Sequence, residues 1–554
     1  TYKGITIMML INNGLLLAYC SYNWSKYIIK YTTESCAIKL NANSWANVSY
    51  ELNFKITALS FLFILLVTII SFSTNIYILN YFKYEERNEE FALLINWFVF
   101  SMIILVSGNN FFTLILGWEL IGITSFLLIN FWKLRTITLT CSLKAFAFNK
   151  VSDLFLMLAF CILWSTYKVS TIDTLLTLIS FNKTANLSSL YLAGICLIIC
   201  SSIKSAQIIG HLWLPDSMEA PVPASSLIHS ATLVSAGIYL ILKFQIIFTL
   251  TNLMPLIFIL GSITACYGGI VAASQTDVKK LLAYSTISHC GFIVASIALN
   301  NFVLTIVYLY LHGLFKAATF FSVGSLIKYN NTQDMRYMGA NKTQTFNTTA
   351  LIITAANLGG LPFTFGYMYK QIFLLHLVIN HYSFIGYGFC LMGMLSSIIY
   401  VYKLIYYSCF DFTKGYINTT ILLIQNYSSL FNKYFSQYTA SKLFAFLSIY
   451  IYAILFYLIM KFYLLNIYIY FQHSPEVSVN DLKFLGDYIF LKKHLISIYY
   501  ILFNITVLVL ILNSWRANYF YIEKITILRQ ILLFVIFYRI INYVTNYLFL
   551  AILM

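Results

Sequence analysis

Two acidic side chains lie inside stretches of sequence that are otherwise apolar. Glu119 falls in the middle of FFTLILGWELIGITSFLLINFW, and Asp153 falls inside AFAFNKVSDLFLMLAF. A carboxylate in such surroundings costs about 3 kcal/mol unless it is paired, hydrated or protonated. Both are therefore candidates to bind and release protons. A structural salt bridge is the alternative for Glu119, and a position near the end of its apolar segment is the alternative for Asp153.

Two lysines occupy comparable positions. Lys204 lies in GICLIICSSIKSAQIIGHLW and Lys370 lies in FGYMYKQIFLLH. A poorly solvated ammonium gives up its proton more readily, and an approaching carboxylate reverses this effect. Both lysines are therefore candidate proton carriers. The alternative is that each long side chain snorkels to an aqueous boundary.

Two histidines also lie in apolar helical patterns, His229 in SSLIHSATLVSAG and His312 in YLYLHGLFKAATFF. An imidazole can pass a proton near neutral pH without large tuning by its surroundings. Lys316 follows His312 by one helical turn and shares its face, which favours a proton relay. Hydrogen-bonded packing is the alternative for each histidine. His289 and His376 have a weaker context.

The spacing of these residues does not fit a metal or nucleotide site. The sequence contains no HxxxH or HExxH pattern, no GxGxxG and no P-loop. The 10 cysteines lie mostly in apolar stretches without a CxxC pair, which indicates packing residues. We expect no cofactor, metal or redox centre in this chain.

The elements that position these residues are predicted to be membrane-spanning helices. Hydrophobic residues make up 60% of the chain and charged residues 9%, which excludes a soluble globular protein. Long apolar runs without strand-like alternation favour helices over a barrel, and less regular candidates bring the number of spans to about fifteen. The clear runs are 57–80, 91–108, 111–132, 145–165, 190–213, 225–249, 254–274, 302–326, 384–409 and 443–470.

The net charge of +16 does not indicate a nucleic-acid partner. Lys and Arg are scattered over short connections such as 133–144, 279–280 and 328–342. This distribution is typical of anchoring at a membrane surface, with lipids as the partner.

Two predicted helices are interrupted, at LWLPDSMEAPVPAS and at NLGGLPF. The first interruption contains Pro215, Pro221 and Pro223, and the second contains Gly359, Gly360 and Pro362. Interrupted spans at corresponding places in two halves indicate an inverted-repeat transporter. The chance occurrence of Gly and Pro in membrane helices is the alternative.

Three parts follow from this pattern. Residues 1–90 comprise N-terminal helices and a polar loop from about Ser21 to Lys55, and residues 91–409 form the core of two repeats. Residues 410–554 hold further predicted helices at 443–470, 494–514 and 529–553. The fold class is thus an all-α polytopic membrane protein with a C-terminal helical tail.

The run KSAQIIGHLWLPDSMEAPVPASSLIHSATLVSAGIYLI (204–241) resembles the signature of subunit 5 of respiratory NADH:ubiquinone oxidoreductase (complex I). The motifs GWELIG (117–122), KAFAFNKVSDLFL (144–156), TDVKKLLAYSTISHCG (276–291) and LHGLFKAATFFSVGS (311–325) stand in the family's order. The resemblance covers roughly residues 91–409. The sister subunits 4 and 2 share the fold. The large subunit of Mrp-type antiporters also shares the fold and has a motif similar to SSLIHSATLVSAG.

The resemblance implies roles for the residues of the first half. Glu119 and Lys204 would be the charge pair of a first half-channel, and Asp153 would assist nearby. His229 would link the two halves.

For the second half, the resemblance implies that His312 and Lys316 continue a polar axis through the membrane centre. Lys370 would be the lysine of the second broken helix, in communication with the outer aqueous phase. Asp277 and Lys280 match family positions on a connection and are expected to be structural.

The sequence departs from the family in four places. Tyr308 stands where the family commonly has a further histidine, so that proton step would need water or the phenol. Gln371 and Ile372 stand where acidic residues usually follow the lysine. Two helices, rather than three, precede 91–108. The tail at 515–554 would reach ~60 Å as one lateral helix, yet 529–553 is apolar enough to be an anchoring span.

The family's function would be proton translocation driven by redox chemistry in other subunits. NADH, FMN, iron-sulfur clusters and ubiquinone would be bound by those partners, and antiporter-like subunit 4 would be a neighbour. A mitochondrial inner membrane location and an organellar gene fit the abundance of Phe, Tyr, Ile, Asn and Lys. The rival interpretations are an Mrp-type cation/proton antiporter subunit and a scaffold that transports nothing.

Overall fold

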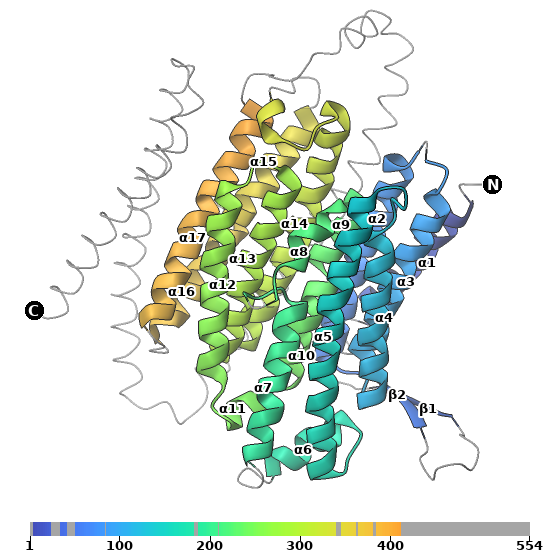
Figure 1. Cartoon of the computed structure of the whole chain (residues 1–554), viewed down its shortest axis with the longest axis vertical. Coiled ribbons are helices and arrows are strands. Elements are labelled where there is room, and N and C mark those ends of the chain that lie inside the picture. The colour runs from blue at the N-terminus through green and yellow to red at the C-terminus, as the bar shows by residue number, and fades with distance from the viewer. Residues whose placement is uncertain are drawn as a thin grey trace, which may run out of the picture. The chain divides into compact units, whose positions relative to one another are not determined.

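The structure is a bundle of long helices (Figure 1). This computed structural model describes residues 4–23, 34–40, 50–83, 85–181, 187–208, 210–339, 345–361, 364–379 and 384–410. The predicted helices at 443–470, 494–514 and 529–553 lie outside the described residues, and so does the question of a lateral helix or an anchor.

The N-terminal part and first half contain α1 (Gly4–Tyr22), β1 (Glu34–Leu40), β2 (Tyr50–Ile56), α2 (Ala58–Tyr81), α3 (Asn88–Ser107), α4 (Phe111–Ile129), α5 (Thr136–Tyr167), α6 (Ile172–Phe181), α7 (Leu187–Lys204), α8 (Trp213–Asp216), η2 (Ser217–Glu219), α9 (Val222–Ser230), α10 (Leu233–Lys243) and α11 (Gln245–Leu250). The second half contains α12 (Met254–Ser274), α13 (Val278–Ala298), α14 (Phe302–Asn330), η3 (Met335–Tyr337), α15 (Thr345–Gly359), α16 (Phe365–Ile379), α17 (Phe384–Ile405) and η5 (Tyr406–Phe410).

Ten helices within the described residues are long and apolar enough to cross a membrane. Each clear run predicted between 57 and 409 falls on one of them, which confirms the polytopic α-helical fold. Helix α13 is a further span that was not among the clear runs. Its Lys, Ser, Thr and His residues lower its hydropathy, although nearly all of it is buried inside the bundle.

Beyond α1 and α2, the helices form two sets of five spans, in which two shorter helices count together as one span where a span is broken. The first set is α3, α4, α5, α7 with α8, and α9 with α10; the second is α12, α13, α14, α15 with α16, and α17. Because five is an odd number, the second set starts from the opposite side of the bundle. The fourth span is broken in each set, with α7 and α16 in the lower half of Figure 1 and α15 in the upper half. This order is that of an inverted repeat.

The first break begins earlier than the sequence pattern predicted and extends into the predicted segment. Helix α7 ends at Lys204 and α8 begins at Trp213, and a second non-helical point follows at Ala220 and Pro221, between η2 and α9. Pro215 lies within α8, and Pro223 lies in the first turn of α9, where a missing backbone N–H costs nothing. Ala206 in the break has a left-handed φ of 53°.

The second break lies where the glycines predicted it. Helix α15 ends at Gly359, and Gly360 follows with a φ of 71°, a conformation that favours glycine. Pro362 lies outside the described residues.

A β-hairpin in the first polar loop was not predicted from the sequence. Strands β1 and β2 pair antiparallel, and Phe54 of β2 bridges to Gly108 between α3 and α4. Asn109 N–H donates to Asn53 O at 2.9 Å, and Ile172 N–H donates to Asn109 O at 2.7 Å. Backbone hydrogen bonds thus join the hairpin to the α3–α4 connection, and that connection to the start of α6 after α5.

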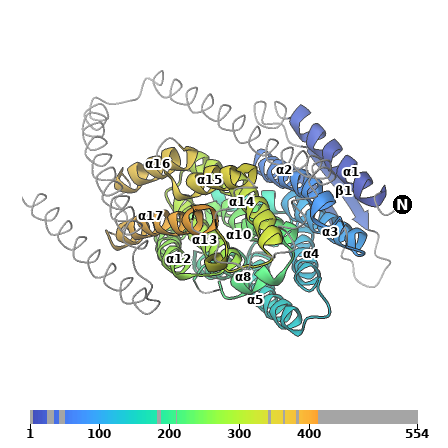
Figure 2. The ribbon, with the colours of Figure 1, turned by 90° about the horizontal axis from the view of Figure 1, so that it is seen from above.

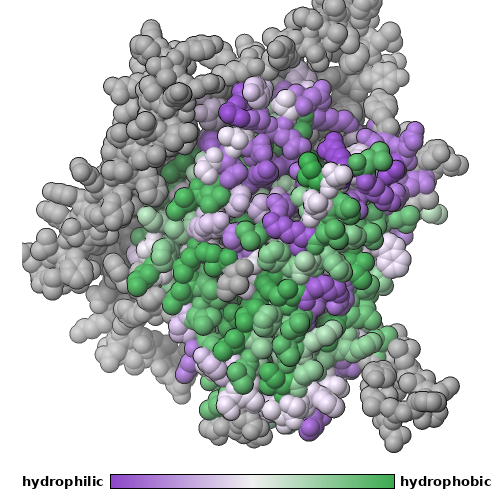
Figure 3. Space-filling view, in the orientation of Figure 1, coloured by the Kyte–Doolittle hydropathy of each residue, from purple (hydrophilic) through white to green (hydrophobic). Residues whose placement is uncertain are grey.

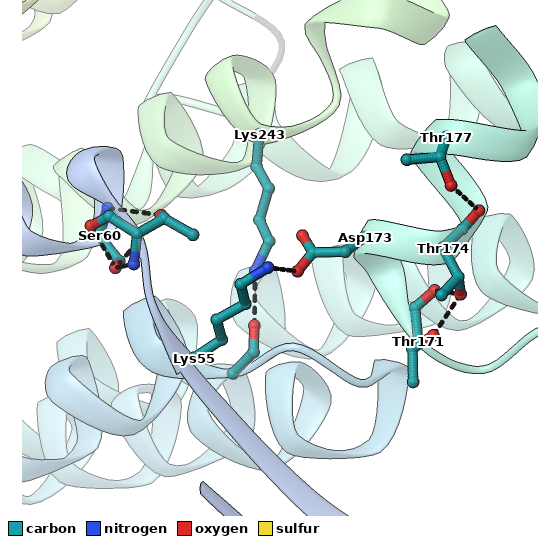
Figure 4. A network of polar contacts seen from close by, with 9 residues as sticks. Lys55, Ser60, Thr171, Asp173, Thr174, Thr177 and Lys243 are labelled. Carbon is teal, nitrogen blue, oxygen red and sulfur yellow. Dashed lines mark hydrogen bonds and ion pairs between the residues drawn. The ribbon is translucent and has the colours of Figure 1, made fainter. Parts of the chain in front are cut away.

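Charged side chains reinforce the same end of the bundle (Figure 4). Lys55 Nζ of β2 pairs with Asp173 Oδ2 of α6 at 2.6 Å. Lys243, the last residue of α10, approaches from the other side and donates to Gly108 O. The cluster joins the hairpin, α6 and α10.

The opposite end is hydrophilic, as the upper part of Figure 3 shows above a largely hydrophobic middle. The ion pairs Lys133–Glu90, Lys144–Asp216, Lys280–Asp277 and Arg336–Asp334 involve residues at or between the helix ends there. Burial raises the pKa of Asp334, but hydrogen bonds and charge from Arg336 outweigh this and hold that pKa below its usual range.

Seen from above, α1, α2 and α3 lie toward one edge, α16 and α17 lie toward another, and α10, α13 and α14 lie between them (Figure 2). Small residues let α12 and α13 approach closely. A Cβ added at Gly291 would lie 2.5 Å from Ala265 N, and one added at Gly261 would lie 2.6 Å from Ala295 N. Helices in a bilayer associate through such packing because lipid supplies no hydrophobic driving force.

We expect Gly291→Ala to destabilise the protein by about 1–3 kcal/mol, because the added methyl group forces two backbones apart. Gly388→Ala is the matched control, since nothing lies within 4 Å of a Cβ there. The measurement is the thermal denaturation midpoint of each variant in detergent. Equal midpoints would contradict the close packing of α12 on α13.

Candidate functional site

The first-half carboxylates share a lysine that the sequence analysis did not single out. Lys150 Nζ of α5 forms an ion pair with Glu119 Oε2 of α4, and it lies 3.5 Å from Asp153 Oδ2 on its own helix. The side chains of Lys150 and Glu119 are 44% and 25% exposed, whereas that of Asp153 is 7% exposed. The signal that could have identified Lys150 is its place one helical turn before Asp153.

Lys204 is buried behind this group. Its Nζ donates to Trp118 O at 3.4 Å and lies 5.2 Å from the centre of the Trp118 ring. Asp153 and Glu119 are the carboxylates near enough for their charge to act on it. At 1% exposure, its ammonium does not snorkel.

The expected direct pair of Glu119 with Lys204 is therefore not what the structure shows. No ion pair within 4.0 Å joins these two side chains, both of which are described. The Glu119 carboxylate instead forms its ion pair with Lys150. Lys204 contacts the backbone carbonyl and the ring of Trp118, the residue before Glu119.

His229 lies where a second helix is discontinuous. Helix α9 ends one residue later, at Ser230, and α10 begins at Leu233. His229 Nε2 is 3.2 Å from Ser217 Oγ of η2, and its ring stacks on Phe320 of α14 at 5.8 Å. The residue thus contacts both the first break region and a helix of the second half. Its Nδ1 has no hydrogen-bond partner among the described residues.

His312 and Lys316 share one face of α14, which packs against α13. Lys316 Nζ donates to Ser285 Oγ at 2.6 Å. Lys316 is close enough to His312 and His229 for their charges to interact. His312 Nε2 is buried without a hydrogen-bond partner among the described residues, and such groups are normally hydrated.

Lys370 is held by the second break. Its Nζ donates to Gly359 O at 2.8 Å, to Leu358 O at 3.3 Å and to Ser397 Oγ of α17 at 2.6 Å. The two carbonyls belong to the end of α15, where the helix no longer uses them. A Cβ at Gly360 would lie 2.8 Å from Lys370 Cδ, so glycine also makes room for the side chain.

The predicted site residues therefore form two groups. Glu119, Asp153 and Lys204 lie together in the first half with Lys150, and His312, Lys316 and Lys370 lie in the second. His229 contacts elements of both. The described residues contain no cluster of three or more His, Cys, Asp or Glu that could hold a metal ion. The chemistry open to this row of groups is the binding and release of protons.

Comparison with known proteins agrees with this architecture. Residues 108–399 match the family described as NADH:quinone oxidoreductase/Mrp antiporter, TM. NADH-ubiquinone oxidoreductase chain 5 of Paramecium tetraurelia is 39% identical over 481 residues, which cover 84% of this chain and 83% of that protein. The chain 5 of Wickerhamomyces canadensis is 34% identical over 442 residues, which cover 78% of this chain and 67% of that protein.

The chain belongs to the NADH-ubiquinone oxidoreductase chain 5 family.

Solved structures show the same fold at lower identity. A chain of the Mrp complex from Dietzia sp. has a TM-score of 0.64 and 19% identity, covering 92% of this chain and 60% of that one. A chain of the archaeal membrane-bound sulfane sulfur reductase has a TM-score of 0.64 and 17% identity, covering 80% of this chain and 92% of that one. These likenesses show the shared fold, whereas the family assignment rests on the chain 5 relatives.

Replacement of Lys150 by Gln should impair proton translocation roughly tenfold, the effect of about 1.4 kcal/mol on a limiting step. The change leaves Glu119 and Asp153 near each other without their shared cation. Lys150→Arg retains the charge and is the matched control. The measurement is proton uptake by membrane vesicles during NADH oxidation, and equal rates for the Gln and Arg variants would contradict a role for the charge.

Proposed function

We propose that this chain translocates protons as a membrane-arm subunit of respiratory NADH:ubiquinone oxidoreductase, driven by redox chemistry in other subunits. The observation that carries the proposal is the buried row of ionisable groups that runs between two broken helices, in a chain of this family. Lys204 ends the helix before the first break, and Lys370 binds the freed carbonyls at the second. Broken helices of this kind form ion sites in transporters.

Movement of charge near Lys204 is the coupling step in this proposal. Asp153 and Glu119 stabilise the Lys204 ammonium, and Lys150 competes for the same carboxylates. A rearrangement that draws Lys150 toward or away from them changes the proton affinity of Lys204. Moving one charge against 100 mV costs about 2.3 kcal/mol, and a change of two pK units, each about 1.36 kcal/mol, matches this cost.

The lateral face of α4 and α5 is the proposed contact with a neighbouring subunit. Lys150 and Glu119 lie near the middle of two spans and are partly exposed. Lipid tails do not solvate such a pair, whereas a polar protein surface does. We assign that surface to an antiporter-like neighbour, subunit 4. NADH, FMN, iron-sulfur clusters and ubiquinone are assigned to partner subunits, with no redox centre in this chain.

The proposed location is the mitochondrial inner membrane, with the gene in the organelle. The relatives that match over most of the chain come from eukaryotes and are chain 5 proteins. The Mrp-type antiporter alternative would use the same residues without a link to NADH. The higher identity to chain 5 proteins than to the Mrp chain favours the respiratory interpretation.

Native membranes, gently solubilised and separated on a native gel, test the assembly. We expect mass spectrometry to find this chain in a large particle that oxidises NADH. If the chain migrates only in a smaller assembly without NADH oxidation, the antiporter alternative replaces the proposal.

Replacement of Lys204 by Ala should abolish proton translocation, because it removes the proton-binding ammonium beside Asp153. Lys133→Ala is the control, since Lys133 forms an exposed pair with Glu90 at the end of the bundle. Proton uptake is compared at equal amounts of assembled complex. Normal uptake by an assembled Lys204→Ala complex would refute the proposed axis.

A further inference from the structure

The row of proton-binding groups has a step without an obvious carrier between His312 and Lys370. His312 lies on α14 and Lys370 on α16, and no hydrogen bond between described residues joins them directly. Tyr308, one turn before His312, stands where the resemblance leads one to expect a histidine. The imidazole nearest to this step comes from another helix: His289 of α13 lies with its ring centre 5.4 Å from that of His312.

Both ring nitrogens of His289 are hydrogen-bonded to phenols. Nδ1 bonds to Tyr308 OH of α14, and Nε2 lies 3.0 Å from Tyr400 OH of α17. All three residues are buried. A neutral imidazole donates from one nitrogen and accepts at the other, and each phenol can do either. The arrangement therefore suits either tautomer of the ring.

Helix α17 continues the path from His289 to Lys370. Tyr400 and Ser397 are three residues apart, and so lie on one face of α17 about one turn, ~5 Å, from each other. Ser397 Oγ accepts the hydrogen bond from Lys370 Nζ at 2.6 Å. The polar groups then run from His312 through His289, Tyr400 and Ser397 to Lys370.

We propose that His289 carries the proton between His312 and Lys370, in place of the histidine that Tyr308 replaces. One ring nitrogen takes up a proton from the side of His312 while the other releases one to the oxygen of Tyr400, whose own proton passes on toward Ser397 and Lys370. A water molecule spans the turn between Tyr400 and Ser397. A half-turn of the imidazole ring about its Cβ–Cγ bond then returns the N–H to its starting side, which restores the starting state with no net change in charge. The inference rests on the proposed proton translocation.

The charged groups around His289 come from two other helices. His312 and Lys316 of α14 and Lys370 of α16 are the groups whose charges reach it. No ion pair within 4.0 Å joins His289 to a carboxylate among the described residues, so no counter-ion holds a proton on its ring. That environment suits a transient carrier. A histidine that only packs would form the same two hydrogen bonds with the phenols without binding and releasing a proton. A variant that keeps the hydrogen bonds but cannot carry a proton therefore distinguishes the two roles.

His289→Gln is the decisive variant, because an amide can still hydrogen-bond to Tyr308 and Tyr400 but cannot carry a proton. We expect proton uptake by the assembled complex to fall roughly tenfold or more, since a positioned acid-base group contributes ~10²-fold or more. His376→Gln is the matched control: His376 lies on α16 and bonds to Asn301 at 3.1 Å, away from this row. Unchanged uptake in His289→Gln would overturn the inference.

The double variant His289→Gln/Tyr308→His separates proton transfer from packing. It moves the imidazole from α13 to α14 within the same contact, so uptake should recover at least partly. An assembled double variant that stays as impaired as His289→Gln would overturn the inference. If His289→Gln does not assemble, Tyr400→Phe takes its place, because it keeps the ring and removes the phenol proton; normal uptake there would also overturn it.

Comparison with Lys204→Ala separates failure of the inference from failure of the proposed function. If Lys204→Ala stops uptake and His289→Gln does not, only the step through His289 is wrong. If neither substitution affects uptake in assembled complexes, the proposed function itself is wrong.

Discussion

An ammonium buried in a hydrocarbon layer must find acceptors in the protein, and this need explains why Lys370 lies at a broken helix. A continuous helix already uses its carbonyls in backbone hydrogen bonds, whereas a break leaves some of them free. At the second break, the carbonyls of Leu358 and Gly359 are free and both accept from Lys370. At the first, Lys204 ends its helix, and its Nζ contacts the carbonyl and ring of Trp118 in the continuous helix α4, so this acceptor does not come from the break. The lysine and the break satisfy each other only at the second break.

The two halves meet this need in different ways. In the first half, two carboxylates share Lys150 in front of the buried Lys204, and part of that group reaches the lateral surface. In the second half, neutral oxygens of Ser285, Ser397 and the backbone hold Lys316 and Lys370. A group surrounded by neutral dipoles can gain or lose a proton with little rearrangement of other charges. A group surrounded by ions changes its proton affinity when those ions move. The proposed function accordingly assigns the response to electrostatic change to the first half and the passage of protons to the second.

The ends of the bundle hold this core by different means. At one end, backbone pairing between the hairpin, 108–110 and 171–172 is joined by the Lys55–Asp173 pair and by Lys243. At the other, side-chain ion pairs predominate, as the hydrophilic zone of Figure 3 indicates. Close packing at glycines such as Gly291 and Gly261 fastens the helices between the two ends.

Hydropathy by itself determined the membrane class, most of the spans and the identity of the buried charges. These follow from local sequence, because the length of an apolar run and the presence of a charge within it can be read without knowing its neighbours in the fold. The second break was also readable, since Gly359 and Gly360 carry their own conformational signal. The first was readable only in part: Pro221 lies at a non-helical point, whereas Pro215 and Pro223 lie within α8 and in the first turn of α9, because prolines are tolerated at the start of a helix.

Only the tertiary structure decided which charges pair. Glu119 faces Lys150 rather than Lys204, and His289, whose own segment offered a weak context, meets Tyr308 and Tyr400 from two other helices. The hairpin likewise depends on its pairing with Gly108, far along the chain. Such contacts depend on how helices turn their faces toward one another. That rotation is set by the packing of the whole bundle. It therefore cannot be read from the residue types and their spacing within one segment.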